Sequence, residues 1–381
     1  MYGHYSAPMD LVDLPTPNLV LDRAKVVSNT SAMTQRMRDH GVKLRPHAKT
    51  AKSAEVARLA AGEGGNALAV STLAEADYFL RHGFTDLIYA VCVAPGKLDE
   101  VSALRERGAD LAIIIDSQET AHAINAHSGV HKVLIEIDCG EHRTGVPVES
   151  ARILELAHIV TGAGRSAIAG VLTHAGHSYL CRTPADAAEV AEAERRAAST
   201  AAEILRTGGF QTPIISVGST PTATHGKTFE GVTEVRPGVY VFQDLFQSGI
   251  GSCAQDAMAL SVLSTIISCR PDRGTLMLDA GGLALSKDRS TAGLGPADDR
   301  GYGTVATIAG DVIPGLDVSG VHQEHGEVRV SDARIFERLT VGHKVRIYPN
   351  HACMTAAAYS RYAVVDGGTR VVDTWDRCNG W

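Results

Sequence analysis

The chain has 381 residues, of which 44% are hydrophobic and 21% are charged, and its formal net charge is −7. This composition is typical of a globular protein with room for two domains, and the acidic balance argues against a nucleic-acid-binding surface. No apolar run approaches the length that crosses a bilayer, so we expect no membrane contact. The stretch Met1–Asp10 shows no basic segment before an apolar core, and seven scattered cysteines form no disulfide pattern. Both features favour a cytoplasmic protein.

Short apolar strands alternate with helical segments over the first two thirds of the chain. The predicted strands are Lys43–His47, Ala67–Ser71, Asp86–Val93, Leu111–Asp116, Val133–Asp138, Ala167–His174, Ile214–Gly218 and Glu234–Phe242. The helical segments between them include Ser53–Ala61, Leu73–His82, Gly96–Arg107, Glu149–Thr161 and Ala185–Thr207. Near-continuous apolar strands separated by helices indicate a parallel sheet with covered faces. Eight strand–helix units predict a (β/α)8 TIM barrel, with an open doubly wound sheet as the alternative.

The pattern changes after Asp256, where short strands alternate with Gly, Asp and Pro. Such runs are typical of antiparallel strands and hairpins. They are Ala259–Ser268, Leu276–Ala280, Val305–Ala309, Glu327–Val330, Lys344–Tyr348, Tyr362–Val365 and Thr369–Thr374. The extended segment Thr16–Asp22 is surplus to the eight barrel strands, and we expect it to pair with this second sheet. We therefore predict a barrel at residues 23–250, a mainly antiparallel β domain at 251–381, and an N-terminal segment at 1–22 that joins the β domain.

Lys49 is the candidate catalytic residue. It ends the run Arg45–Lys49 after the first predicted strand, and the active sites of such barrels lie where the strands end. A lysine there can hold a carbonyl cofactor covalently as a Schiff base, and burial would lower its pKa as that chemistry requires. Arg45 or His47 could supply nearby polarity. The alternative is that Lys49 is an ordinary surface lysine exposed to solvent. We expect Lys52 to be such a surface lysine.

A small-residue loop follows the seventh predicted strand, in the sequence Gly218-Ser219-Thr220-Pro221-Thr222. Exposed backbone N–H groups and hydroxyls suit a dianionic phosphate. The next loop contains Gly238 and Tyr240, and barrels often bind phosphate on the loops after strands seven and eight. The alternative reading is an ordinary turn.

Two more strand ends are unusually polar. Arg143, after the fifth strand, could donate to a cofactor ring nitrogen or to a substrate carboxylate. His174 and Tyr179, after the sixth strand, could stack on a ring or form a hydrogen bond with it. A salt-bridged surface arginine and a capped loop histidine are the competing explanations.

The motif His351-Ala352-Cys353 follows the strand Lys344–Tyr348. An imidazole and a thiolate spaced i, i+2 on an extended segment point to the same side, so one metal ion could accept both. The thiolate favours Zn²⁺ over Mn²⁺ or Mg²⁺, and two protein ligands would leave coordination positions open for water and substrate. In the same domain, Gln323 and His325 are candidates for contacting the substrate or relaying protons. The alternative explanation of the His351-Ala352-Cys353 motif is a buried cysteine beside an incidental histidine.

Taken in order, these motifs resemble the fold-type III pyridoxal-phosphate enzymes of the D-serine dehydratase and D-threonine aldolase family, which have an alanine racemase-like barrel. The resemblance covers nearly the whole chain. The motifs that carry it are Arg45–Lys49, Glu136–Asp138, Arg143–Val146, Thr173–Gly176, Ser216–Ala223, Gln323–Gly326 and Pro349–Cys353. The resemblance implies that Lys49 carries pyridoxal 5'-phosphate and that His351 and Cys353 hold a divalent metal. It also implies that Gly218, Ser219, Thr220, Gly238 and Tyr240 lie at the phosphate, and that the protein is a homodimer.

One position favours a subclass. Aldolases of this family usually carry aspartate two residues after the metal histidine, whereas this chain has Cys353, as the dehydratases do. We therefore expect a lyase that removes water from a small D-β-hydroxy-α-amino acid, D-serine or D-threo-3-hydroxyaspartate, to give a 2-keto acid and ammonia. The alternatives are retro-aldol cleavage to glycine and an aldehyde, a metal-free racemase, and a non-catalytic cofactor carrier.

Overall fold

The computed structural model describes residues 9–381, so residues 1–8 of the predicted N-terminal segment lie outside the described part of the chain. The chain divides into two compact units. One unit consists of Ser31–Tyr240 with the last two residues, and the other consists of the chain up to Thr30 together with Val241–Asn379. No described helix is both long enough and apolar enough to span a membrane.

The first unit contains eight parallel strands in the order β3-β11-β10-β9-β7-β6-β5-β4, and a short strand β8 pairs with β7 beside them. The strands are β3 (Lys43–Leu44), β4 (Ala67–Val70), β5 (Asp86–Cys92), β6 (Asp110–Ile115), β7 (Lys132–Asp138), β8 (Val146–Pro147), β9 (Ala167–Thr173), β10 (Ile214–Val217) and β11 (Glu234–Val235). A parallel bridge between His47 and Ala69 joins the two ends of this order, with the Ala48 N–H donating to the Ala69 carbonyl over 2.8 Å. The predicted (β/α)8 barrel is therefore confirmed.

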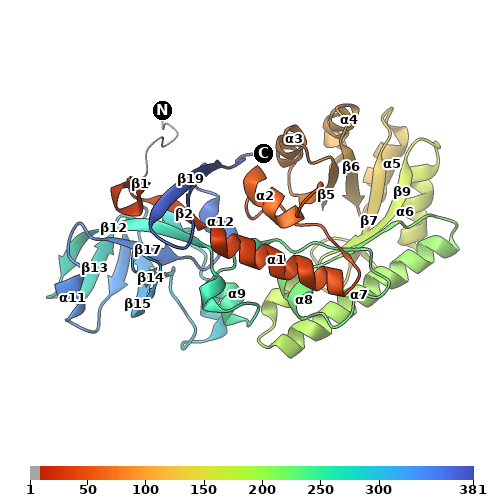
Figure 1. Cartoon of the computed structure of the whole chain (residues 1–381). Coiled ribbons are helices and arrows are strands. Elements are labelled where there is room, and N and C mark those ends of the chain that lie inside the picture. Colours follow the sequence, from red (N-terminus) through yellow and green to blue (C-terminus); the bar gives the residue numbers. More distant parts are fainter. Residues whose placement is uncertain (1–8) are drawn as a thin grey trace. The chain divides into compact units, whose positions relative to one another are not determined.

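Helices cover the outside of the barrel strands (Figure 1). They are α1 (Arg23–Asp39), which begins in the other unit, α2 (Ala54–Ala61), α3 (Leu73–Arg81), α4 (Leu98–Glu106), α5 (Gln118–Ala126), α6 (Arg152–Thr161), α7 (Pro184–Thr207) and α8 (Thr220–His225). Polar caps define where several of them begin. Thr72 accepts the Glu75 N–H at the start of α3, and Thr183 forms a capping box with Asp186 at the start of α7.

The eighth strand is shorter than its apolar sequence suggests. We predicted a strand over Glu234–Phe242, but β11 ends at Val235 and the 3-10 helix η4 (Val239–Val241) follows. Pro237 has no N–H to donate to a strand ladder, so the pairing of β11 does not continue through it. Gly238 and Tyr240 consequently belong to a loop at the end of the barrel strand.

The second unit is built on one sheet in the order β1-β19-β18-β2-β12-β13-β16-β15-β14-β17. Its strands are β1 (Met9–Asp10), β2 (Asn18–Asp22), β12 (Leu260–Arg270), β13 (Thr275–Leu278), β14 (Thr304–Ala306), β15 (Val312–Val321), β16 (Gly326–Arg329), β17 (Lys344–Tyr348), β18 (Arg361–Val365) and β19 (Arg370–Asp376). Strand β17 also pairs with β12, so the six strands from β12 to β17 form a closed ring. The predicted mainly antiparallel β domain is confirmed. Among the described residues, β18 and β2 form the one parallel pair of this sheet.

One strand of this ring was missed by the sequence analysis. Strand β15 (Val312–Val321) contains Pro314 and Gly315, which normally argue against a strand. A register shift between β14 and β15 accommodates them, because Thr304 pairs with Asp317 while Ala306 pairs with Val312.

A buried histidine near the start of β7 makes the stability of the barrel depend on pH. Burial, followed by the neighbouring charges of His127 and Arg105, lowers the pKa of His131 to about 4. Its Nε2 lies 3.0 Å from Nδ1 of His127, which in turn contacts Asp99. Because the unfolded chain binds a proton near pH 6.5 and the folded chain does so only near pH 4, acidification between these values favours unfolding.

We expect this histidine to reduce the free energy of unfolding by up to about 1.4 kcal/mol per pH unit below pH 6.5. Urea unfolding of the wild type and of His131→Asn at pH 7, 6 and 5 would measure the effect. The variant should lose less stability on acidification than the wild type. Equal losses in the two proteins would contradict the assignment.

Candidate active site

Lys49 lies in the turn that follows the His47 bridge, at the carboxyl end of the first barrel strand. Its backbone N–H donates to Nδ1 of His47 over 3.4 Å. The side chain is exposed, so the prediction that it is buried is wrong. An exposed amine at this end of the barrel is accessible to a small molecule.

Lys52 is also placed differently from our expectation. We predicted a solvated side chain, but its Nζ lies 2.9 Å from Oε1 of Glu75, whose side chain is fully buried. The backbone of Lys52 has a φ of 48°, in the left-handed region. Lys52 is thus a structural residue that secures the turn carrying Lys49.

Two histidines share the electrostatic environment of Lys49. Burial, and then the positive charges of Lys49 and Arg236, lower the pKa of His47 well below its usual value. Burial and the Lys49 charge likewise lower the pKa of His174 to about 3. Both rings are therefore neutral at physiological pH. A neutral imidazole can stack on an aromatic ring or donate a hydrogen bond to it without adding a charge.

The loop after β10 is the small-residue loop predicted to bind phosphate, and the N–H groups of Gly218 and Ser219 donate to Glu194 and to Oγ1 of Thr222. Gly218 has a φ of +122°, and a Cβ added there would lie 2.8 Å from the Arg236 nitrogen. Ser219 is the N-cap of α8 and accepts the Thr222 N–H, while Gly218, Ser219 and Thr220 are all buried. His174 reaches this loop, with Nδ1 3.0 Å from the Gly218 carbonyl oxygen. The ends of β9 and β10 are thus directly linked.

The loop after β11 completes this region. The Tyr240 N–H donates to Oγ1 of Thr220 over 3.2 Å. The Tyr240 hydroxyl is buried and has no hydrogen-bond partner within the described residues. A Cβ on Gly238 would lie 3.3 Å from His47, so glycine allows the close approach of these two loops. An unsatisfied buried hydroxyl beside small-residue loops fits a phosphate ester as its missing partner.

Arg143 and Tyr179 occupy loops at the same end of the barrel. Arg143 is exposed and lies 3.4 Å from Glu141, and its charge contributes to the low pKa of His174. Tyr179 belongs to the 3-10 helix η3 (Gly176–Leu180) and is half-buried. The Gly176 N–H donates to Glu141, which joins the two loops. The structure therefore places the predicted barrel residues on loops at the end of the barrel that carries Lys49 and His174.

Arg236 was not singled out from the sequence, although it lies centrally in this region. It is buried, and its guanidinium donates to the Ser216 hydroxyl and to the Thr173 carbonyl, each over 2.6 Å. Ser216 in turn donates to Glu234, which also pairs with Arg45 at 2.8 Å. Arg45 and Glu234 form a buried ion pair, and Ser216 links Arg236 to it, so this network fixes the strand ends that carry the loops. The available signal was the pair of charged residues Glu234 and Arg236, spaced i, i+2 at the end of an expected barrel strand.

The second unit contains the predicted metal pair, but not on an extended segment as we expected. His351 is the N-cap of a short helix, α12 (Ala352–Ala356), and Cys353 lies in its first turn. Burial opposes protonation of the ring, yet the Cys353 sulfur, with which the ring forms a hydrogen bond, and the carboxylates of Asp288 and Asp244 raise the pKa of His351 to about 11. Concentrated negative charge around one imidazole is a donor set that fits a divalent cation.

Two aspartates that the sequence analysis missed hold this helix and ring. Oδ2 of Asp288 lies 2.9 Å from Nδ1 of His351, which leaves Nε2 as the nitrogen available to a metal. Asp244 is buried and accepts the Ala352 N–H over 3.0 Å while capping helix α9 (Leu245–Gly249). A carboxylate on the far nitrogen of a histidine ligand is the usual way to orient such a ring.

The relay candidates Gln323 and His325 lie in an exposed turn between β15 and β16. This turn packs against the start of helix α10 (Gly282–Leu285), whose Leu283 N–H donates to the Gln323 carbonyl over 3.1 Å. The last residue of α10 contacts α12, because the Thr355 hydroxyl donates to the Leu285 carbonyl over 2.7 Å. Helix α10 therefore connects the turn to the helix that carries Cys353.

Cys92, Asp116 and Glu136 form a further cluster at the ends of neighbouring barrel strands, with potential ligand atoms within 4.8 Å of one another. The Cys92 thiol donates to Glu136 over 2.9 Å. Burial and the two carboxylates raise the pKa of Cys92, so the thiol keeps its proton and donates it to Glu136 in a hydrogen bond.

Comparison with known proteins places this geometry in a family. A family model described as the N-terminal domain of alanine racemase matches residues 21–245, and one described as a putative serine dehydratase domain matches residues 259–365. D-threo-3-hydroxyaspartate dehydratase from Delftia sp. strain HT23 is 44% identical, and the match covers 97% of this chain and 99% of that protein. The chain belongs to the D-serine dehydratase and D-threo-3-hydroxyaspartate dehydratase family.

Further relatives match the chain in structure or in sequence. The solved Delftia dehydratase matches with a TM-score of 0.93 at 43% identity, covering 98% of this chain and all of that one (100%). D-serine dehydratase from Dictyostelium discoideum is 30% identical over 98% of each chain. D-threonine aldolase from Arthrobacter sp. is also 30% identical, covering 97% of this chain and 93% of that protein. The dehydratases are lyases, and the fold and both matched domains agree with that class.

Proposed function

We propose that the protein is a pyridoxal-phosphate- and metal-dependent dehydratase that converts D-threo-3-hydroxyaspartate or D-serine into a 2-keto acid and ammonia. The observation that carries the proposal is the imidazole–thiol pair of His351 and Cys353, present in a chain whose barrel offers an accessible lysine. A cysteine-to-alanine mutant of D-threo-3-hydroxyaspartate dehydratase has been solved in a metal-free form. That finding supports a metal role for the cysteine in a relative.

In this proposal the barrel unit binds the cofactor. Lys49 would hold it through Nζ, while Gly218, Ser219 and Thr220 would lie beside its phosphate and the Tyr240 hydroxyl would donate to it. His174 and Tyr179 would contact its ring, and Arg143 would donate to a ring nitrogen or to the substrate carboxylate. Gly238 provides the space for these contacts, because a Cβ there would lie only 3.3 Å from His47.

The reaction needs a base at the α-carbon and help for a poor leaving group at the β-carbon. When bound, pyridoxal phosphate withdraws electrons from the α-carbon, and a divalent cation polarises the β-hydroxyl. Lys49 Nζ would take the α-proton, as a neutral amine within reach of the substrate can. His351 and Cys353 would hold the cation, with Asp288 fixing the ring, and Gln323 or His325 would move a proton near the departing hydroxyl. Loss of water and hydrolysis then yield ammonia with oxaloacetate from 3-hydroxyaspartate, or with pyruvate from serine.

The thiolate ligand favours Zn²⁺ over Mn²⁺ or Mg²⁺ as the cation. We also propose that the protein acts as a homodimer in the cytoplasm, where its cysteines, which form no disulfide within the described residues, remain reduced.

Retro-aldol cleavage is the second candidate, because an aldolase is among the relatives that match nearly the whole chain. The same groups support it if the proton is removed from the β-hydroxyl instead of the α-carbon. Cys353 favours dehydration, because aldolases of this family usually carry aspartate at this position.

We expect the protein, supplied with pyridoxal phosphate and Zn²⁺, to release equal amounts of ammonia and keto acid from D-threo-3-hydroxyaspartate or D-serine. Assays of ammonia, keto acid, glycine and aldehyde on these substrates and on D-threonine would test this. Glycine and aldehyde as the main products would establish the aldolase instead. Conversion of D- to L-amino acid without either product pair, unaffected by EDTA, would indicate a racemase.

A further inference from the structure

A single charged residue interrupts the buried face of α7 (Pro184–Thr207). Glu194 is 1% exposed, whereas the other buried positions of this helix are mainly alanines, including Ala191 and Ala198 one turn to either side. The alanines let α7 approach the barrel closely. A buried carboxylate costs free energy unless it is hydrogen-bonded, so a glutamate at this position requires specific partners.

The partners of Glu194 are the backbones of two barrel loops. Its Oε1 accepts the N–H of Ala175 and the N–H of Gly218, each over 2.9 Å. Burial raises the pKa of Glu194, while these N–H groups, the Thr222 hydroxyl and the Arg236 charge oppose that rise. One carboxylate oxygen thus joins the loop after β9 to the loop after β10.

These two loops carry the groups assigned above to the cofactor. Ala175 directly follows His174, and Gly218 directly precedes Ser219, the N-cap of α8. The loops are also joined by the His174–Gly218 contact and by the Ser178 and Ser219 hydroxyls, which lie 2.7 Å apart. Because Glu194 accepts both N–H groups on one atom, it sets the separation of the ring-contacting histidine from the phosphate loop.

We propose that Glu194 is a positioning residue for the phosphate of pyridoxal phosphate, acting by holding the loops after β9 and β10 at a fixed spacing. The proposal rests on the proposed function, in that it assumes that the barrel binds this cofactor. Glu194 would act through the loops and not by contact with the cofactor, since its carboxylate already accepts the N–H groups of Ala175 and Gly218 and the Thr222 hydroxyl.

Replacing Glu194 by alanine leaves two buried N–H groups without their acceptor, and we expect the dissociation constant for pyridoxal phosphate to rise about 10- to 100-fold. Binding would be measured by titrating the cofactor-free protein and recording the absorbance of the bound cofactor. Glu194→Gln retains one carbonyl oxygen at the position of Oε1, so it should bind nearly as the wild type does. Circular dichroism would establish that each variant is folded.

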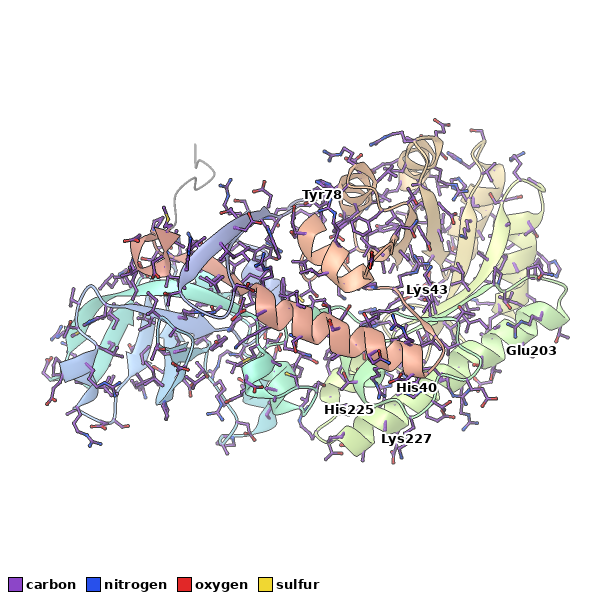
Figure 2. All side chains as sticks on the ribbon, viewed as in Figure 1. His40, Lys43, Tyr78, Glu203, His225 and Lys227 are labelled. Atoms are coloured by element: carbon purple, nitrogen blue, oxygen red, sulfur yellow. The ribbon has the colours of Figure 1, made fainter. Side chains whose placement is uncertain are left out.

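Glu203→Ala is the matched control on the same helix. Glu203 lies further along α7 (Figure 2), and its side chain is largely exposed and 3.6 Å from Arg206. This variant should bind pyridoxal phosphate as the wild type does.

Pyridoxal, which lacks the phosphate, separates a positioning role from a general loss of structure. Glu194→Ala should weaken binding of pyridoxal phosphate much more than binding of pyridoxal. Equal weakening of the two ligands, wild-type affinity in Glu194→Ala, or an equal loss in Glu194→Gln would each overturn the proposal. If the wild type itself binds no pyridoxal phosphate, the proposed function fails, and that outcome is distinct from the others.

Discussion

Replacement of Lys49 by alanine should abolish covalent attachment of pyridoxal phosphate and lower turnover of D-hydroxyamino acids by about 10³-fold or more. The reason is that one amine serves both as the attachment point and as the base at the α-carbon, and each role alone has a large effect on rate. The measurements are the absorbance spectrum of the bound cofactor, borohydride trapping followed by peptide mass spectrometry, and product formation. In the wild type, trapping should label the peptide that contains Lys49.

Lys132→Ala provides the control for this experiment. Lys132 begins β7, at the opposite end of the barrel strands from Lys49, and its ion pair with Asp110 is partly exposed. Exposed pairs contribute little to stability, so this variant should retain both the spectrum and the activity. Lys52 is unsuitable as a control because its pairing with buried Glu75 supports the turn. An unchanged spectrum in Lys49→Ala would remove Lys49 from its assigned role.

Replacement of Cys353 by alanine should reduce the affinity for Zn²⁺ by more than about 100-fold, because loss of an inner ligand exceeds the effect typical of outer partners. Activity should fall roughly 10³-fold, in keeping with the several kcal/mol that a Lewis acid supplies to a leaving group. Metal content of the purified protein, competition with a chelator, and ammonia release would be measured. EDTA treatment of the wild type should have the same effect, reversed by added Zn²⁺.

Two variants sharpen this test. Cys269→Ala removes a cysteine from β12 in the same unit, and it should leave metal content and activity unchanged. Cys353→Asp keeps an anionic ligand but replaces sulfur with oxygen, so the preference should shift from Zn²⁺ towards Mn²⁺. Full turnover by metal-free wild-type protein would contradict the dehydratase mechanism and favour a reaction without a Lewis acid.

The sequence was most informative where local pattern and long-range packing agree. The barrel strands β4, β5, β6, β7, β9 and β10 were recognised because buried parallel strands are apolar at nearly every position. The errors lie where backbone chemistry overrides side-chain pattern. Pro237 ends strand β11 in an apolar run, whereas Pro314 and Gly315 hide strand β15, whose pairing depends on a register shift supplied by β14.

For the candidate site, the sequence by itself determined which residue types are available for the proposed chemistry: the amine of Lys49, the small-residue loop at Gly218, and the imidazole–thiol pair of His351 and Cys353. Only the tertiary structure decided which groups support them. Asp288 is 63 residues from His351 along the chain, and Glu194 is 24 from Gly218, yet each makes a hydrogen bond of 2.9 Å. Such partners carry no local motif, because a carboxylate acquires its role from the donor that folding brings to it.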